Sequence, residues 1–124
     1  MSAAEFDRVM HGVAQAWGAG EMEASLRFFH PGIVYYGVPH GEALGLEALS
    51  AYFACAPAPM ALTWRHLAFA QATRVGLGEY TFEMAGRSYG VVVARLRDGR
   101  IDRWREYRVK SALSWPEFTG GHPF

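Results

Sequence analysis

Residues 102–107 hold the side chains whose types and spacing are best suited to chemistry. Neighbouring side chains of a β-strand point to opposite faces, so this stretch separates into two sets: Asp102, Trp104 and Glu106 on one face, and Arg103, Arg105 and Tyr107 on the other. We expect the arginines on the outer, convex face and Glu106 inside, beside Trp104. A carboxylate held against an indole in an apolar cavity loses solvation, which suits a general acid or base. The alternative is a structural ion pair between Glu106 and an arginine of a neighbouring strand.

A second alternating stretch covers residues 79–84. Its aromatic face carries Tyr80, Phe82 and Met84, and its charged residues fall on the other face. We expect the aromatic face to point inward, where the Tyr80 hydroxyl would donate a hydrogen bond to a substrate oxygen. Phe82 and Met84 would then line the pocket. Plain core packing is the alternative for all three, and Tyr35 has the same two interpretations as Tyr80.

Two of the five histidines are candidates for a proton-transfer partner of Glu106. His40 follows a short predicted strand, at the expected mouth of the pocket, and His66 is expected to share a strand face with Trp64. A hydrogen-bonded structural role is the alternative for each. The spacing of the histidines and carboxylates matches no metal-ligand pattern, so we expect no metal site.

The composition argues against several classes of function. The chain has 124 residues, of which 51% are hydrophobic and 15% aromatic, with 12 basic and 12 acidic side chains. This length suits one domain with a sizeable core, and the net charge of zero argues against binding nucleic acid or a polyanionic membrane surface. Cys55 is the single cysteine, and neither a secretory signal nor an apolar run long enough for a membrane span is expected, which favours a cytoplasmic protein. No glycine-rich phosphate loop is found, so no cofactor is implied.

Hydrophobic periodicity predicts the elements that position these residues. It indicates a capped helix that follows Ser2 and ends at Gly18, then a short helix over 21–29, a strand over 33–38 and a helix over 46–55. Four more strands are predicted over 62–75, 77–85, 87–97 and 100–109, joined as an antiparallel meander. The order predicts an α+β fold with helices on one face of a curved sheet and a conical pocket between them. We expect one domain over 1–110 and a C-terminal tail over 111–124 packed on it.

Four stretches are similar to the SnoaL-like branch of the nuclear-transport-factor-2-like superfamily: 16–24, 34–39, 45–49 and, most specifically, 98–107 with its Trp-Arg-Glu-Tyr ending. The resemblance implies a cone-shaped α+β barrel, in which a curved, mostly antiparallel sheet wraps around the N-terminal helices. It also implies a homodimer formed through the convex face of the sheet. Polyketide cyclases, ketosteroid isomerases and limonene-epoxide hydrolases are members, so the fold alone does not choose an activity.

Within the superfamily, the last strand most resembles that of the limonene-epoxide hydrolases. Glu106 stands where those enzymes carry a catalytic aspartate between Arg and Tyr, and Trp104 matches a pocket tryptophan. Tyr80 and Phe82 stand where an Arg and an Asp complete the acid–base relay, and the first strand keeps the water-holding Tyr as Tyr35 but has Gly37 in place of an Asn. Ketosteroid isomerases carry a basic Asp where this chain has Val38. The resemblance therefore does not extend to either complete catalytic set.

These observations lead to a first hypothesis and two alternatives. The first is a cofactor-independent enzyme that transfers protons on an apolar, oxygenated small molecule, by cyclisation, isomerisation, dehydration or hydration. The alternatives are a non-catalytic domain that binds a small ligand, and a scaffold whose pocket is filled by side chains. The candidate catalytic residues are Glu106, Tyr80, Tyr35, His40 and His66. The candidate substrate-binding residues are Trp17, Phe82, Met84, Trp104 and Trp64.

Overall fold

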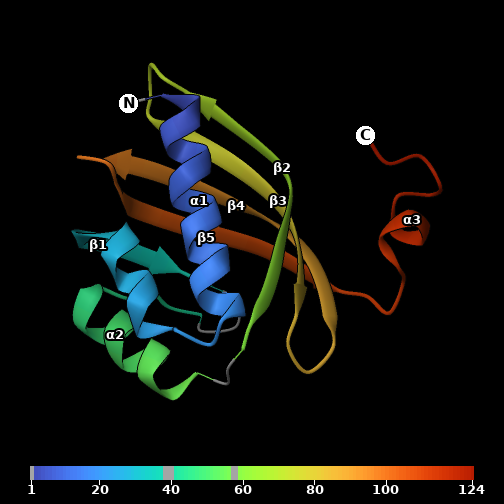
Figure 1. Ribbon diagram of the computed structural model, residues 1–124, viewed down its shortest axis with the longest axis horizontal. Coiled ribbons are helices and arrows are strands. Elements are labelled where there is room, and N and C mark those ends of the chain that lie inside the picture. Colours follow the sequence, from blue (N-terminus) through green and yellow to red (C-terminus); the bar gives the residue numbers. More distant parts are fainter. Residues whose placement is uncertain (1, 38–40, 57–58) are drawn as a thin grey trace.

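The computed structural model describes residues 2–37, 41–56 and 59–124. Its elements follow one another as α1 (Ala3–Gly18), the 3₁₀ helix η1 (Glu23–Phe28), β1 (Phe29–Tyr36), α2 (Leu46–Cys55), β2 (Ala61–Ala70), β3 (Val75–Glu83), β4 (Arg87–Arg97), β5 (Arg100–Lys110) and α3 (Trp115–Phe118). The strands form one sheet in the order β1-β5-β4-β3-β2 (Figure 1). β1 pairs with β5 in parallel, and the other neighbours are antiparallel. The predicted α+β fold and the four-strand meander are confirmed.

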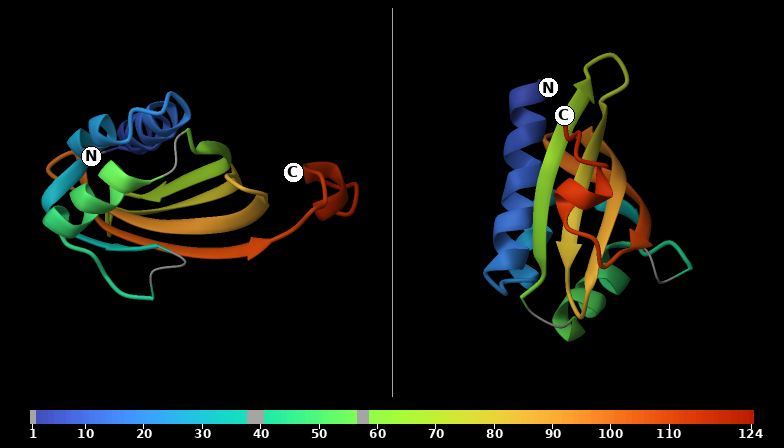
Figure 2. Two further views of the ribbon diagram at one scale, coloured as in Figure 1. Left: turned by 90° about the horizontal axis from the view of Figure 1, so that it is seen from below. Right: turned by 90° about the vertical axis from the view of Figure 1, so that its right-hand side faces the viewer.

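Helix α1 begins as its sequence predicts, because the Ser2 side chain accepts a hydrogen bond from the backbone N–H of Glu5. Its apolar stripe, which includes Phe6 and Trp17, is buried against the sheet. The sheet makes room for it at Gly76 on β3, where a Cβ atom would collide with the Phe6 ring. Figure 2 shows α1 and α2 on the same side of the curved sheet, so the hydrophobic core lies between helices and concave face.

Strand β1 starts four residues earlier than predicted. The segment His30-Pro31-Gly32, which lies between the helix predicted over 21–29 and the strand predicted over 33–38, is already part of the strand. Proline is tolerated there because β1 is an edge strand and Pro31 has no N–H to contribute to a ladder. The register between Phe29 and Val34 is irregular, and the preceding helix is the six-residue 3₁₀ helix η1 rather than an α-helix.

The strand predicted over 62–75 ends earlier, at Ala70, as β2. Its chain turns at 71–74, where Arg74 adopts a left-handed φ of 59° and its N–H bonds the Ala70 carbonyl. β3 therefore already begins at Val75. No glycine or proline marks this turn, which is why the alternating pattern runs through it unbroken.

The C-terminal tail carries the short helix α3 and extends from the end of β5 (Figures 1 and 2). Phe118 stacks on Tyr89 of β4 with ring centroids 4.0 Å apart, and Arg65 of β2 lies over the Trp115 ring at 4.8 Å. The Tyr89 hydroxyl donates to the Leu113 carbonyl at 2.5 Å. These contacts bury Tyr89 on the outer face of the sheet.

Candidate functional site

Glu106 points into the interior, and three aromatic side chains donate hydrogen bonds to its carboxylate. Trp104 Nε1 donates to Oε1 at 2.7 Å, Tyr35 Oη donates to Oε1 at 3.3 Å, and Tyr80 Oη donates to Oε2 at 2.7 Å. Only 7% of Glu106 is exposed. The expected inward direction of Glu106 is therefore observed, and the described partners of its carboxylate are neutral donors instead of the arginine of a structural ion pair.

The parallel pairing of β1 with β5 brings Tyr35 to this carboxylate. Tyr35 lies opposite Trp104 in the register, and their rings stack at 5.5 Å with an interplanar angle of 10°. Both Tyr35 and Trp104 are almost fully buried. The stacked pair holds two of the three donors on the same side of the Glu106 carboxylate.

Tyr80 reaches Glu106 from two strands away because a glycine lies between them. In the register, Tyr80 of β3 is opposite Gly90 of β4, and Gly90 is opposite Arg108 of β5. A Cβ atom on Gly90 would come within 2.7 Å of the Tyr80 hydroxyl and would also collide with the Tyr107 carbonyl. The missing side chain at Gly90 is what lets the phenol cross β4.

The environment keeps both phenols neutral. Burial is the main cause that raises the pKa of Tyr35 well above its usual value, and the charge of Glu106 adds to it. Burial, then the charge of Glu106 and the hydrogen bond to it, likewise raises the pKa of Tyr80. Tyr35 and Tyr80 are therefore hydrogen-bond donors across the physiological pH range.

The carboxylate retains capacity for a further partner. A carboxylate oxygen has two lone pairs, and among the described residues Oε1 accepts two hydrogen bonds whereas Oε2 accepts one. Oε2, beside the Tyr80 hydroxyl, is thus the atom of Glu106 that can accept a proton from another molecule.

The five predicted wall residues surround this centre at different depths. Trp17, Phe82 and Trp104 are buried, while Trp64 and Met84 are partly buried. Trp64 packs edge-on against Tyr80 and Trp104 and donates from Nε1 to the Met10 carbonyl. Trp17 lies further back, where its Nε1 donates to the Ser25 hydroxyl.

Two residues near the carboxylate were missed by the sequence analysis. Tyr52 of α2 is half-buried, and burial, then the charge of Glu106, raises the pKa of its phenol. Arg108 of β5 lies over the Phe82 ring, with Cζ 5.0 Å from the centroid. Alternation along β5 is the signal that finds Arg108, because it follows the inward-pointing Glu106 by two residues.

The structure does not bring His66 to Glu106. Arg65 is an extra residue in β2, because Trp64 pairs with Tyr80 and His66 with the next residue, Glu79. This bulge reverses the alternation, so the expectation that His66 shares the face of Trp64 is wrong. His66 Nδ1 lies 2.8 Å from the Glu79 carboxylate, and 41% of its side chain is exposed. The other candidate, His40, lies outside the described residues.

A second bulge corrects the position of Asp102. The register shifts between Arg95 and Leu96, so Ile101 and Trp104 both point inward and Asp102 turns to the outer side. Asp102 is nevertheless buried, because Arg95 covers it with two hydrogen bonds of 2.9 and 2.7 Å. The hydrogen bond from Arg95 lowers the pKa of Asp102.

Three further findings concern other parts of the described chain. The single cysteine, Cys55, is exposed at the end of α2. Over residues 2–37, 41–56 and 59–124 there is no group of three or more His, Cys, Asp or Glu side chains that could hold a metal ion. No helix within those residues is long and apolar enough to cross a membrane.

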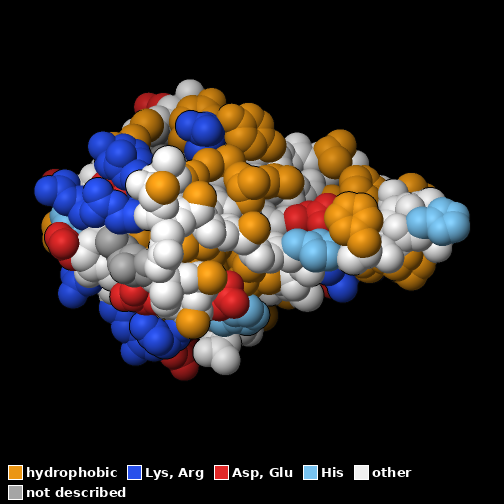
Figure 3. All heavy atoms as spheres, turned by 90° about the horizontal axis from the view of Figure 1, so that it is seen from above, with side chains coloured by type: hydrophobic (Ala, Val, Ile, Leu, Met, Phe, Trp, Pro, Cys, Tyr) orange, Lys and Arg blue, Asp and Glu red, His pale blue; other side chains and the backbone are white. Residues whose placement is uncertain are grey.

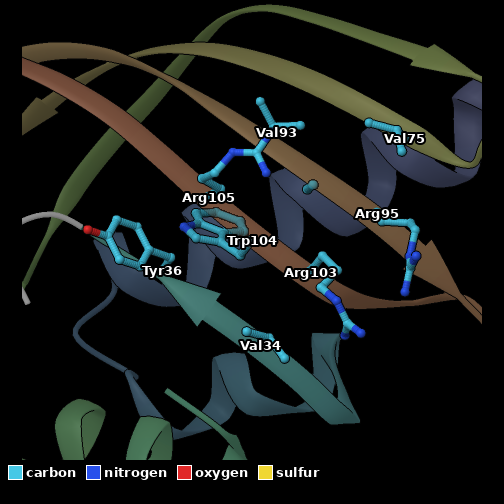
Figure 4. Close-up of a pocket in the computed structure, with 9 residues that line it drawn as sticks. Val34, Tyr36, Val75, Val93, Arg95, Arg103, Trp104 and Arg105 are labelled. Atoms are coloured by element: carbon cyan, nitrogen blue, oxygen red, sulfur yellow. The ribbon is translucent and has the colours of Figure 1, made fainter. Parts of the chain in front are cut away.

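The outer face of the sheet has a hollow of about 310 Å³. Figure 4 shows its apolar residues, Val34, Tyr36 and Val93, with arginine side chains around them. Seen from above, arginine side chains gather at the end of the molecule that holds β1 and the β4–β5 turn (Figure 3). The expected assignment of Arg103 and Arg105 to the outer face is therefore observed.

A family model described as the SnoaL-like domain matches residues 10–104. The chain belongs to this family. Residues 10–104 run from α1 into β5 and include Tyr35, Tyr80 and Trp104 of the SnoaL-like domain, while Glu106 lies two residues beyond the match. A comparison of the sequence with curated proteins finds no match.

Solved structures share the fold of this SnoaL-like domain at low sequence identity. An NTF-2-like protein of unknown function from Burkholderia xenovorans is 19% identical, with a TM-score of 0.74 over 93% of this chain and 92% of that one. A Delta 5-3-ketosteroid isomerase from a Mycobacterium species is 19% identical, with a TM-score of 0.69 over 83% and 92% of the two chains. An LEH-like epoxide hydrolase of M. tuberculosis is 15% identical, with a TM-score of 0.68 over 86% and 84%. The SnoaL-like domain therefore has the nuclear-transport-factor-2-like fold that its sequence predicts.

Proposed function

We propose that this SnoaL-like protein is a cofactor-independent enzyme that moves a proton on an apolar, oxygenated small molecule. The observation that carries the proposal is the buried Glu106 carboxylate, which is held by Tyr35, Tyr80 and Trp104. A buried carboxylate that keeps acceptor capacity is the group a proton-transfer reaction requires. The family and the fold, which it shares with an isomerase and an epoxide hydrolase, are consistent with this chemistry.

The proton would move between the substrate and Glu106 Oε2. In an isomerisation, Oε2 takes a proton from a carbon next to a carbonyl group and returns it to another carbon of the same molecule, so the enzyme ends unchanged. While Oε2 holds the proton, its O–H can donate to Tyr80 Oη, and the Tyr80 hydroxyl can turn its own hydrogen to the substrate oxygen. The Tyr80–Glu106 hydrogen bond would thus link proton uptake by Glu106, the base, to hydrogen-bond donation by Tyr80 to the substrate oxygen.

A turnover panel with a matched variant tests the proposal. Epoxides, enones and polyketide-like ketones would be incubated with the wild type and with Glu106→Gln, which keeps the shape of the side chain but removes its basicity. We expect turnover of at least one class by the wild type, reduced by about 100-fold or more in Glu106→Gln. Turnover that is unchanged in the variant would contradict the role of Glu106. Ligand binding without turnover in either protein would favour the non-catalytic binding domain, and absence of both would favour the scaffold.

We further propose that two copies associate through the convex face of the sheet. Apolar side chains on this face are unusually exposed, among them Leu77 (49%) and Tyr107 (57%). The register places Tyr36, Arg105, Val93 and Leu77 in one row across four strands. Exposed apolar side chains bordered by charged ones, as on this face, are typical of a protein interface.

Sedimentation velocity would test the association. We expect the wild type to sediment as a dimer and Leu77→Lys, which places a charge at an exposed apolar position of this face, as a monomer. Ala51→Lys, which changes an exposed residue of α2, is the matched control and should remain dimeric. A monomeric wild type would contradict the proposal.

The cytoplasmic location inferred from the sequence also remains a proposal.

A further inference from the structure

Arg108 occupies the strand position next to the candidate catalytic residue on the inner face. It follows Glu106 by two residues on β5, so the two side chains point to the same side of the sheet. The register also places Arg108 in one row with Gly90 and Tyr80. Along the inner face of β5, Trp104, Glu106 and Arg108 follow one another. The guanidinium therefore lies on the side of Glu106 opposite Trp104, toward the C-terminal end of the strand.

Contact with the wall fixes the position of this guanidinium. Arg108 Cζ lies 5.0 Å from the centroid of the Phe82 ring, a cation–π distance. Phe82 is itself buried, whereas Arg108 is only partly so. A guanidinium stacked by its face on an aromatic ring still directs its N–H donors sideways, in the plane of the group.

The positive charge reaches the phenols on either side. Arg108 acts to lower the pKa of both Tyr52 and Tyr80, against the larger effect of burial. Tyr52 belongs to α2 and Tyr80 to β3, so the charge lies between the helical wall and the sheet. A molecule that approached Glu106 between these elements would pass the guanidinium.

We propose that Arg108 binds a carboxylate group of the small molecule whose apolar part lies against Phe82 and Met84 and whose reacting part reaches Glu106. This inference deepens the proposed function and rests on it for the placement of the ligand at Glu106. One planar guanidinium matches one carboxylate through two parallel hydrogen bonds. A multiply charged phosphate is disfavoured, because the Glu106 carboxylate is nearby and a single guanidinium balances a single negative charge.

Arg87, Arg95 and Arg105 of this sheet differ from Arg108 in position, because their side chains lie on the outer face, away from Glu106. Arg95 is bound by two hydrogen bonds to Asp102, and Arg87 bonds Glu83 on the exposed surface. Arg105 points to the outer face of β5, three residues from Arg108, and lies 5.8 Å from the Tyr107 ring. Arg105 therefore serves as a matched control: it has the same residue type and strand but the opposite face.

Paired ligands that differ only in charge test the proposal. Calorimetric titrations would compare 2-naphthylacetate with 2-naphthylacetamide, and 4-phenylbutyrate with its amide, as ligands of the wild type, Arg108→Gln, Arg108→Lys and Arg105→Gln. We expect the wild type and Arg105→Gln to bind a carboxylate at least about tenfold more tightly than its amide, the size of a charged hydrogen bond. Arg108→Gln should remove this preference and leave amide binding unchanged, and Arg108→Lys should keep part of it.

Three results with the wild type and Arg108→Gln would overturn the proposal: equal affinity of the wild type for acid and amide, a preference that survives in Arg108→Gln, or no binding of any of the four probes. Loss of the preference in Arg105→Gln as well would also overturn it, because that would show a general effect of charge. These binding results are separate from turnover. Preference for the acid with no turnover of any substrate would refute the enzyme proposal alone, and turnover without the preference would refute the Arg108 proposal alone.

Discussion

Tyr80 crosses strand β4 over Gly90 and donates a hydrogen bond of 2.7 Å to Glu106 on strand β5. The contact joins residues 26 positions apart in the chain and depends on an atom that is missing from a third residue. Neither side chain would have this partner if the middle strand carried a Cβ atom at that point.

Gly90→Ala should destabilise the protein and displace the Tyr80 hydroxyl, because the new methyl group would come within 2.7 Å of it and would press against a backbone carbonyl. We expect the free energy of unfolding to fall by about 1–3 kcal/mol, the usual cost of overpacking. Urea denaturation would measure the loss. Gly18→Ala is the control, since a Cβ atom there meets nothing within 4 Å. Equal stability of both variants would contradict the role assigned to Gly90.

Alkaline pH should weaken the fold through Tyr35 and Tyr80. Burial raises the pKa of both phenols in the folded state, so unfolded chains release these protons first. The stabilisation is complete below the unfolded pKa of about 10 and is lost as the pH rises toward the folded values, by up to about 1.4 kcal/mol per pH unit for each tyrosine. Unfolding by urea at several pH values would show this slope. Tyr80→Phe should lower it, and an unchanged slope would count against the buried phenol.

Arg95→Met should destabilise the protein more than Arg105→Met. Asp102 is buried beneath Arg95, so removal of the guanidinium leaves a carboxylate without its two hydrogen bonds, at a cost of about 2 kcal/mol. The lowered pKa of Asp102 gives the matching pH dependence: its stabilisation is present above the unfolded pKa of about 3.9 and is lost as the pH falls toward the folded value. Thermal unfolding of both variants at neutral and acidic pH would measure this. A smaller loss for Arg95→Met than for Arg105→Met would refute it.

His66→Gln should leave turnover and ligand affinity unchanged, because His66 lies on the outer face beside Glu79. Steady-state kinetics with any substrate found in the panel would measure this. Tyr80→Phe is the positive control, since it removes a donor to Glu106. A loss of kcat in His66→Gln comparable to that in Tyr80→Phe would mean that the outer face takes part in the reaction.

Removal of residues 111–124 should leave a folded domain with lower stability. In the tail, Phe118 stacks on Tyr89, and the Leu113 carbonyl accepts a hydrogen bond from the Tyr89 hydroxyl. The tail contributes none of the three donors to Glu106. We expect retained far-ultraviolet circular dichroism and a lower melting temperature. Phe118→Ala in the full chain should show a smaller effect of the same sign. An unfolded truncated chain would show instead that the domain does not end before the tail.

Alternation and turn chemistry predicted the meander, the inward direction of Glu106 and the grouping of Trp104 with it. The predictions failed where one extra residue changes the parity of a strand. Arg65 and Asp102 are such residues. The first bulge turns His66, and the second turns Asp102 itself, to the other face from the one expected. A bulge depends on the pairing of two strands, so no local pattern in one strand reveals it. The turn before Val75 was not predicted because its left-handed residue is Arg74, and no glycine marks the position in the sequence.

The partners of Glu106 also divide into those that the local sequence pattern predicts and those that depend on tertiary packing. Tyr35 and Tyr80 were chosen as inward donors, but their common acceptor follows only from the order of the strands, with β5 between β1 and β4. Arg108 could have been found by counting two residues from Glu106. Tyr52 could not, because its approach depends on how α2 packs against the sheet.

The parallel pairing of β1 with β5 also sets an order in which the chain can fold. Tyr35 and Trp104 are paired in that register, so the loop that must close between them spans most of the chain. During synthesis, β1 leaves the ribosome long before the strand that completes it, whereas β2 to β5 can pair as successive hairpins. The donor set of Glu106 is therefore expected to assemble in the last stage of folding, when the first strand joins a meander that is already formed.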